Sequence, residues 1–281
     1  MKKFLLVPLL ISNFCFGQNR GLEFTEKFYD AVDKWVVFDT RAGDSIYIVG
    51  FIYVDMQAGF TFNYESKFAI TNEGFKIIPE DRESMVKHRL GRNTADIAIL
   101  SAEAIKQLEL PQEPDWLKHY KEQENDNAYL VRLGLHFNAV GASHKALEPL
   151  LKVYEKEPHF KGLEFELAYA YNATQQFDKA VDILNSAIKN DPKNFWFYRE
   201  LGFSHIHQNE PDNAEKAYLQ GIELATDKLQ KSEMAFNMTS YYFTHKNRLQ
   251  FEKWAKLTKQ YADTNSQYYQ YTNYFEENWN K

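Results

Sequence analysis

Histidines and carboxylates are the side chains of this sequence that could carry acid–base or metal chemistry. The 8 histidines are scattered, and no paired-histidine metalloprotease motif is present. His205 and His207 lie two residues apart, and on a helix this spacing points them to different faces. Carboxylates such as Glu164 and Glu166 are expected on solvated helix faces. Because nothing in the sequence places a second group opposite them, they do not predict a general acid–base pair.

Nucleophilic and phosphate-binding motifs are also missing from the sequence. It has no glycine-rich phosphate loop and no nucleophile elbow, and Gly50 and Gly59 are isolated. Cys15 is the only cysteine. If Cys15 leaves with a signal peptide, the mature chain has no disulfide, thiolate metal site or thiol nucleophile. We therefore expect no catalytic residues, no metal and no cofactor, and we favour binding over catalysis.

An alternative places chemistry in the N-terminal half of the chain. There, an envelope enzyme or a carbohydrate-binding protein would need a cleft with converging polar groups, and the C-terminal half would be its docking arm. The loose candidates for such a cleft are Arg41, Asp55, Glu65 and Arg82.

The elements of the C-terminal half follow a fixed period of 34 residues. A Leu followed by a small residue recurs as Leu133-Gly134, Leu167-Ala168 and Leu201-Gly202. Other places recur with it, namely Phe137, Tyr171 and His205; Ala146, Ala180 and Ala214; Leu150, Leu184 and Tyr218; and Val153, Ala187 and Gly221. Pro158 and Pro192 close the first two units, where a proline ends a helix. Such a period predicts stacked supersecondary units rather than one closed core.

This pattern resembles the tetratricopeptide repeat, a helix-turn-helix of 34 residues. The resemblance covers residues 127–226 and implies an all-α superhelical array. It also implies that the first helix of each unit lines a concave face that binds a peptide segment or a partner helix. In this reading the small residues let the two helices of a unit approach closely.

We expect an apolar and aromatic partner-binding face on these first helices. Its predicted residues are Phe165, Tyr169, Asn172, Trp196, Arg199, Phe203 and His207, with Val131, Leu135 and Asn138 in the first unit. The Lys, Asn and Arg clamp with which some family members grip a terminal carboxylate is absent, so chaperone-tail binding is not implied. The N-terminal domain could itself fill this groove, or a constant partner could cover it in a purely structural subunit.

The rest of the helical half is predicted to hold a degenerate fourth unit and a cap. Residues 234–242 and 249–261 have helical patterns, and the linker before them is about three residues longer. Tyr268, Tyr271, Phe275 and Trp279 form one helical stripe that would cover the last unit. The predicted domains are a small domain at 20–115 and an array at 116–281, with units at 127–160, 161–194, 195–228 and 232–262.

The domain at 20–115 is predicted to be α+β, a helix packed on an antiparallel meander. Helical spacing of aromatic residues predicts a helix over 22–38, and strands are expected at 46–54, 59–66 and 75–78. Residues 68–71 would continue the second strand or return as another. Phe60, Phe62 and Tyr64 alternate with polar residues, which favours packing of this strand on the helix. Residues 96–100 would add an edge strand, and Ser101 would cap a helix. Lys87, His88, Arg89 and Arg92 are expected in a solvated loop.

The first 17 residues are predicted to be a bacterial-type signal peptide. Lys2 and Lys3 precede a short apolar stretch, and cleavage is expected before Gln18. Lipidation of Cys15 is the alternative reading. The chain would then be exported to the periplasm or outside, without a further membrane span, and its partner would be another envelope protein or a peptide segment. A formal net charge of −6 does not suit nucleic-acid binding.

Overall fold

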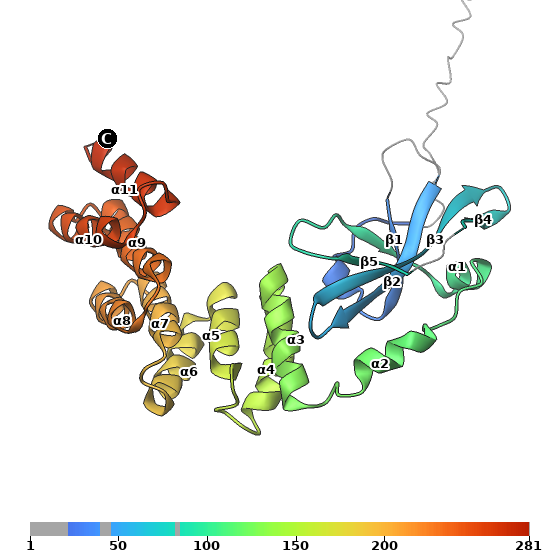
Figure 1. Cartoon of the computed structure of the whole chain (residues 1–281), viewed down its shortest axis with the longest axis horizontal. Coiled ribbons are helices and arrows are strands. Elements are labelled where there is room, and N and C mark those ends of the chain that lie inside the picture. The colour runs from blue at the N-terminus through green and yellow to red at the C-terminus, as the bar shows by residue number, and fades with distance from the viewer. Residues whose placement is uncertain (1–21, 40–45, 82–84, 281) are drawn as a thin grey trace, which may run out of the picture. The chain divides into compact units, whose positions relative to one another are not determined.

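The computed structural model describes residues 22–39, 46–81 and 85–280, which form two compact units (Figure 1). The sheet unit comprises the described residues of Met1–Tyr53, Phe62–His88 and Ala95–Pro114. The helical unit comprises Val54–Thr61, Arg89–Thr94 and the described residues of Asp115–Lys281. The predicted signal peptide with Cys15, and also Arg41 and Arg82, lie outside the described residues.

Among the described residues, six strands form one antiparallel sheet in the order β4-β3-β2-β1-β6, and β5 also pairs with β3. The strands are β1 (Lys34–Phe38), β2 (Ile46–Asp55), β3 (Gly59–Thr71), β4 (Gly74–Ile78), β5 (Val86–Arg89) and β6 (Ile97–Ile99). The predicted meander and edge strand are therefore confirmed. The Ser101 hydroxyl accepts a hydrogen bond from the Ala104 N–H and caps α1 (Ala102–Gln107), as expected.

The predicted helix over 22–38 is wrong. Only a 3-10 turn, η1 (Phe28–Asp30), precedes the strand β1. Asp33 takes a positive φ of 59°, which interrupts any helix there. Trp35-Val36-Val37 is an aromatic and β-branched run, and pairing with both β2 and β6 buries it in the middle of the sheet. Trp35, part of the spacing that suggested a helix, is therefore a core residue of the sheet instead.

Residues 86–89 are also not the predicted loop, because they form β5 on β3. Arg89, the last residue of β5, belongs to the helical unit. Its guanidinium donates to the Thr61 hydroxyl at 2.8 Å. Aromatic pairs fill the sheet unit itself: Trp35 meets Phe51 edge-on at 5.1 Å, and Phe38 meets Phe62 at 4.9 Å. Phe62 is buried, but against Phe38 of β1 rather than against the expected helix.

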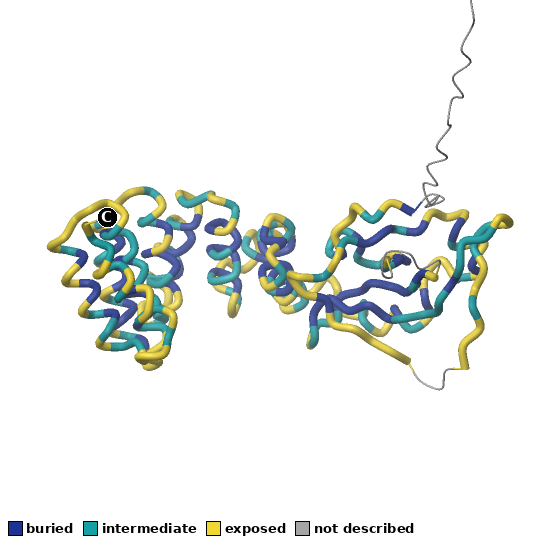
Figure 2. Tube along the Cα trace, turned by 90° about the horizontal axis from the view of Figure 1, so that it is seen from above, coloured by how far each residue is buried: buried dark blue, intermediate teal, exposed yellow. Residues whose placement is uncertain are grey.

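The helical unit consists of antiparallel helix pairs that follow one another along the chain (Figure 1). A short segment of η2 (Asp115–Leu117) and α2 (Lys118–Lys121) leads into them. The pairs are α3 (Asn127–Val140) with α4 (Ser143–Tyr154), α5 (Leu163–Ala173) with α6 (Phe177–Asn190), α7 (Phe195–His207) with α8 (Pro211–Leu224), and α9 (Lys228–Thr244) with α10 (Arg248–Tyr261). Buried and exposed residues alternate along each helix, as expected for amphipathic helices packed side by side (Figure 2).

Close approach of the two helices within a pair depends on small residues, as the sequence predicts. A Cβ at Gly134 would lie 2.5 Å from Leu150 Cγ, and one at Gly202 would lie 2.6 Å from Tyr218 Cδ1. Ala146, Ala180 and Ala214 are fully buried on the second helices.

The turn within each pair uses a residue with positive φ at the same place. These residues are Gly141, Gln175, Asn209 and Lys246, with φ of 85°, 59°, 60° and 54°. Their numbers differ by 34, 34 and 37. The predicted longer linker before the fourth pair is wrong, because only residues 225–227 separate α8 from α9; α9 is instead the longer first helix, with 17 residues against 13 in α7. A left-handed residue ends the first helix and lets the chain reverse.

The last pair is covered by α11 (Gln267–Glu277), which confirms the predicted cap. Phe275 stacks on Phe243 at 4.3 Å, and Trp279 stacks on Phe251 at 4.7 Å. Both rings close an apolar cluster that contains the fully buried Trp254. No described helix, α11 included, is both long and apolar enough to span a bilayer.

Residues 54–61, which connect β2 to β3, cover the first helix of the array. Phe60 packs on Phe137 of α3 at 5.2 Å, so it does not pack on a helix at 22–38 as expected. A ring nitrogen of His136 lies 3.1 Å from the Met56 carbonyl oxygen. These contacts cover the apolar side of α3, which begins the array.

Candidate partner-binding face

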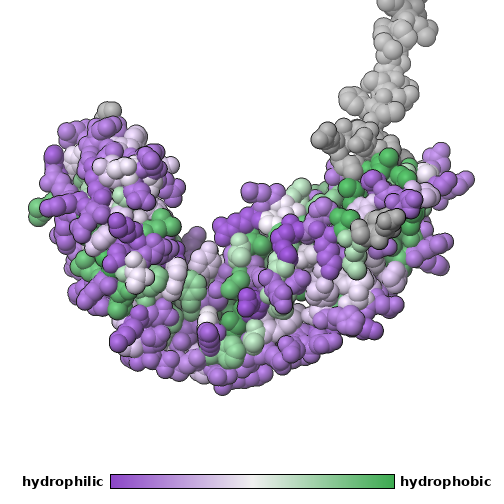
Figure 3. All heavy atoms as spheres, in the orientation of Figure 1, coloured by the Kyte–Doolittle hydropathy of each residue, from purple (hydrophilic) through white to green (hydrophobic). Residues whose placement is uncertain are grey.

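The first helices α5, α7 and α9 carry side chains from equivalent places of successive repeats. We call the surface formed by Phe165, Tyr169, Trp196, Arg199, Phe203, His207 and Glu233 the first-helix face. Figure 3 shows that the surface over the helices is mostly hydrophilic, with separate small hydrophobic areas. Any partner site there depends on a few anchors rather than on a broad apolar patch.

One aromatic group lies across α5 and α7. Phe165 meets Trp196 edge-on at 5.6 Å, and Tyr169 lies 6.5 Å from Phe165. The Arg199 guanidinium lies 5.2 Å from the centre of the Trp196 ring. Trp196 stays 36% exposed, so its ring is anchored but not covered.

A second aromatic group surrounds His207. Phe203 lies 4.3 Å from His207, whose other side stacks on Phe177 at 5.0 Å. Burial lowers the pKa of His207, so the ring is neutral at pH 7. Phe203 is 37% exposed. The structure thus brings six predicted residues to one face in two groups.

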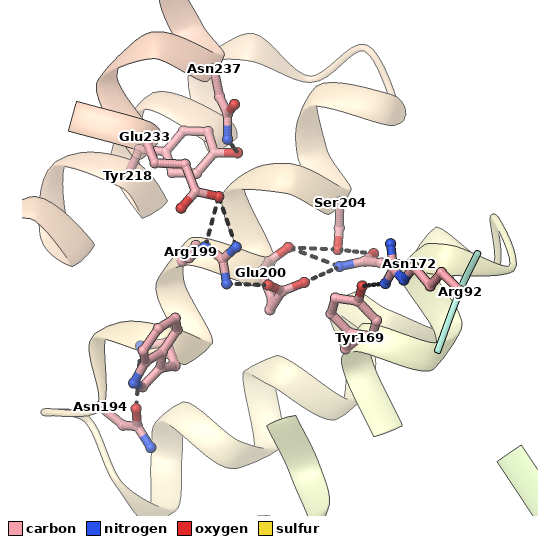
Figure 4. A network of polar contacts seen from close by, with 11 residues as sticks. Arg92, Tyr169, Asn172, Asn194, Arg199, Glu200, Ser204, Tyr218, Glu233 and Asn237 are labelled. Carbon is pink, nitrogen blue, oxygen red and sulfur yellow. Dashed lines mark hydrogen bonds and ion pairs between the residues drawn. The ribbon is translucent and has the colours of Figure 1, made fainter. Parts of the chain in front are cut away.

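The seventh predicted residue, Asn172, is used inside the array. It is 5% exposed, and its amide N–H group donates to the Glu200 carbonyl at 3.2 Å and to the Glu200 carboxylate at 3.1 Å. Its oxygen accepts from the Ser204 hydroxyl at 2.7 Å (Figure 4). Asn172 therefore joins α5 to α7 and has no polar atom left over for a partner.

The same bond recurs one repeat earlier. The amide of Asn138 donates to the Glu166 carbonyl at 2.9 Å and to the Glu166 carboxylate at 2.8 Å. Both bonds join residues 28 apart, and both residues recur after 34. Sequence reasoning missed this pair, although two asparagines and two glutamates at the repeat spacing were a visible signal.

Glu164 and Glu166 are therefore not on solvated faces, and that expectation is wrong. Glu164 is 5% exposed and pairs with His159 at 2.8 Å. Burial raises the pKa of Glu166, while the Asn138 hydrogen bond acts the other way. Glu166 and Glu200 are accommodated in the array because an asparagine of the preceding first helix donates to each of them, whereas Glu164 is paired with His159. His205 is half-buried and bonds to Glu210 at 2.8 Å, as a packed histidine should.

Arg199 connects two repeats through carboxylates (Figure 4). Its Nη2 lies 2.7 Å from Glu233 Oε1, and its Nη1 lies 3.2 Å from Glu200 Oε1. Arg199 and Glu233 lie 34 residues apart, on the first helices of the third and fourth pairs. Burial raises the pKa of Glu200, and the Arg199 guanidinium opposes that rise.

The start of the face is occupied by this chain's own Arg92. Its Nε donates to the Ala139 carbonyl at 3.0 Å, and its Nη2 lies 3.5 Å from the Tyr169 hydroxyl. Val131 and Asn138 of the first unit are buried, and Leu135 is half-buried. The first unit therefore offers little of the predicted face, which lies instead on the second and third units.

Comparison with known proteins agrees with the repeat pattern. Residues 160–204 match a family model described as tetratricopeptide repeat. The chain therefore contains a tetratricopeptide repeat at these residues, within an array of similar helix pairs. A search of curated proteins finds no match.

The chain is also similar to solved structures. One is a thermophilic TPR protein of Thermus thermophilus, with 17% identity, a TM-score of 0.48, and coverage of 58% of this chain and 87% of that chain. Another is a MamA fragment of Desulfovibrio magneticus, with 14% identity, a TM-score of 0.44, and coverage of 52% and 80%.

The polar residues suggested for an alternative site lie in two depressions. Glu65 lines one of about 470 Å³ in the sheet unit, together with Pro79 and Glu80. Asp55 lines one of about 460 Å³ in the helical unit, together with His119 and Glu122. Within the described ranges of the chain, no three His, Cys, Asp or Glu side chains gather as metal ligands would.

Proposed function

We propose that this protein is a protein–protein interaction scaffold that holds an apolar segment or helix of its partner on the first-helix face. One observation carries the proposal: Trp196 and Phe203 are both more than a third exposed on α7. They are seven residues apart, so they lie on the same side of the helix, about 10 Å apart along its axis. Large aromatic side chains held in place by packing are typical interface anchors.

The proposed anchors are rigid before a partner arrives. Trp196 is held by Phe165 and Arg199, and Phe203 is held by His207. A side chain that is already fixed loses little conformational freedom on binding, which favours affinity. The spacing of the two rings suits an apolar helix or extended segment that crosses α7.

We further propose that this interaction takes place outside the cytoplasm. The support is the sequence pattern of the first 17 residues, with Lys2 and Lys3 before a short apolar stretch. Sequencing the N-terminus of the protein recovered from an envelope fraction tests this. A start at Gln18 supports export, whereas a mature chain that keeps Met1 in the cytosolic fraction contradicts it.

The binding proposal is tested with a phage-displayed peptide library selected on the full chain. Peptides that bind are then measured against Trp196→Ala and Phe203→Ala. We expect each variant to lose about tenfold or more in affinity, the effect of removing one aromatic anchor. Leu219→Ala is the matched control, because Leu219 is 43% exposed on the second helix α8.

Circular dichroism must show that all three variants keep the helical content of the original chain. The proposal fails if the selected peptides bind Trp196→Ala and Phe203→Ala as tightly as the original chain. It also fails if Leu219→Ala is the variant that loses binding, since the site would then lie on the second helices.

A further inference from the structure

We propose that the partner segment of this face is basic, with a Lys or Arg side chain between apolar residues that docks against the carboxylates around Arg199. This inference rests on the proposed function, and it names the chemistry of the occupant. It is carried by the charges on the first-helix face, by the bonds that Arg199 already makes and by the place of Arg92.

Carboxylates outnumber cations where the repeats meet. Glu200 and Glu233 share the single guanidinium of Arg199. Glu166 is held by the neutral amide of Asn138. Burial and the neighbouring Glu200 carboxylate both raise the pKa of Glu166. An added cation would relieve this excess of negative charge, and an added anion would increase it.

Arg199 is already engaged by two carboxylates. Its Nε and Nη2 both donate to Glu233 Oε1, at 3.2 Å and 2.7 Å, and its Nη1 donates to Glu200. Its guanidinium carbon lies 5.2 Å from the centre of the Trp196 ring. These bonds use three of the five N–H donors of the guanidinium, and a partner carboxylate at the other two would be repelled by Glu200 and Glu233 beside it.

The chain itself shows which group this surface accepts. Arg92 from the segment 89–94 donates to the carbonyls of Asn138 and Ala139 at the end of α3. The same guanidinium reaches the hydroxyl of Tyr169, a residue of the face. Carbonyls at a helix C-terminus and aromatic rings both favour a cation. A basic side chain of a partner would extend this arrangement from Tyr169 towards Trp196 and Glu233.

The test uses three pools of synthetic apolar peptides that differ at two fixed positions, which hold Lys or Arg, Gln, or Glu. Fluorescence anisotropy measures their affinity for the full chain at low and at raised salt. We expect the basic pool to bind about tenfold more tightly than the Gln pool, as for one partly buried charge pair. We expect the Glu pool to bind most weakly, and the preference for the basic pool to shrink with salt.

Two variants on the face give effects of opposite sign. Glu233→Gln removes a carboxylate and is expected to weaken the basic pool several-fold. Arg199→Gln frees both carboxylates and is expected to strengthen it. Glu223→Gln, on the exposed side of α8, makes the same change in net charge and is expected to change nothing.

The outcomes separate this inference from the proposed function. If the Gln pool binds as tightly as the basic pool and loses binding in Trp196→Ala, the face is a binding site and the charge inference is wrong. If the Glu pool binds best and Arg199→Gln abolishes that binding, the inference is overturned in favour of an acidic partner. If no pool depends on Trp196, both proposals are wrong.

Discussion

Two neighbouring junctions of the array are packed with different chemistry. Between the second and third pairs, the buried Asn172 amide donates hydrogen bonds to Glu200. Thirty-four residues later, the sequence has Ile206 and Met234 in the places of these two residues. Met234 is fully buried, and Ile206 packs against the same apolar cluster. At this place one junction is therefore polar and the next is apolar, although the next junction also holds the Arg199–Glu233 ion pair.

The difference shows what each junction contributes. A buried polar pair is tolerated when its groups have hydrogen-bond partners. Here the Asn172 N–H group donates to Glu200, and the Asn172 oxygen accepts from Ser204. This junction keeps charge near the first-helix face, where a partner can use it. The apolar junction has no carboxylate at this place. Its charged pair is Arg199 with Glu233, and its apolar cluster, together with the cap, closes the end of the array.

The strongest way to break the comparison is to remove the centre of the apolar junction. Trp254→Ala deletes a fully buried ring whose Nε1 donates to Glu215 at 2.8 Å. We expect a loss of about 3–5 kcal/mol in the free energy of unfolding, measured by urea denaturation. Leu249→Ala on the same helix, where the leucine is 77% exposed, should change stability by less than about 0.5 kcal/mol. Equal losses in the two variants would mean that Trp254 is not the centre of this junction.

The polar junction is tested by replacing one of its two polar residues with the apolar residue type found 34 positions later. Asn172→Ile leaves the buried Glu200 carboxylate and carbonyl without their amide partner. We expect a loss of about 2–3 kcal/mol in urea denaturation, the cost of unsatisfied buried polar groups.

The double variant Asn172→Ile/Glu200→Met then copies the pair found one repeat later. We expect it to recover part of the lost stability, because both polar groups of the pair are gone. A double variant that is as unstable as the sum of its single variants would show that the two junctions are not interchangeable.

Most of the repeat architecture was readable because its signals are local and periodic. Gly134 and Gly202 predict close contacts between the two helices of a pair, and in the structure Leu150 and Tyr218 lie against them. The caps and turns likewise depend on a few neighbouring residues. The aromatic stripe on α11 predicted a cap because a single helical period describes it.

The errors occurred where long-range pairing decides. Phe28 and Trp35 have helical spacing, but strand pairing on both sides of Val36 and Val37 overrides it. The sequence predicts Glu166 on a solvated face and Asn172 on the partner-binding face. Both predictions are wrong because the hydrogen-bond partner of each residue lies 28 residues away on another helix. Their burial follows from a pairing between repeats, which no single helix period contains.

The smallest expected effect concerns how the stability of the first polar junction depends on pH. Glu166 has a pKa raised above its ordinary 4.5, mainly by burial, so the folded state holds its proton more tightly than the unfolded state. Ionisation therefore costs stability as pH rises above that ordinary value, and the cost is absent below it. Glu166→Gln keeps an oxygen for the Asn138 amide and removes the charge.

We expect Glu166→Gln to melt at a higher temperature than the original chain at about pH 7, and at the same temperature near pH 4, in thermal scans followed by circular dichroism. Glu223→Gln, which removes an exposed charge, should show no such change with pH. If Glu166→Gln is less stable at neutral pH, then the carboxylate itself holds the first polar junction together. Its negative charge would then already be balanced within the array, and a basic partner would gain nothing by approaching it.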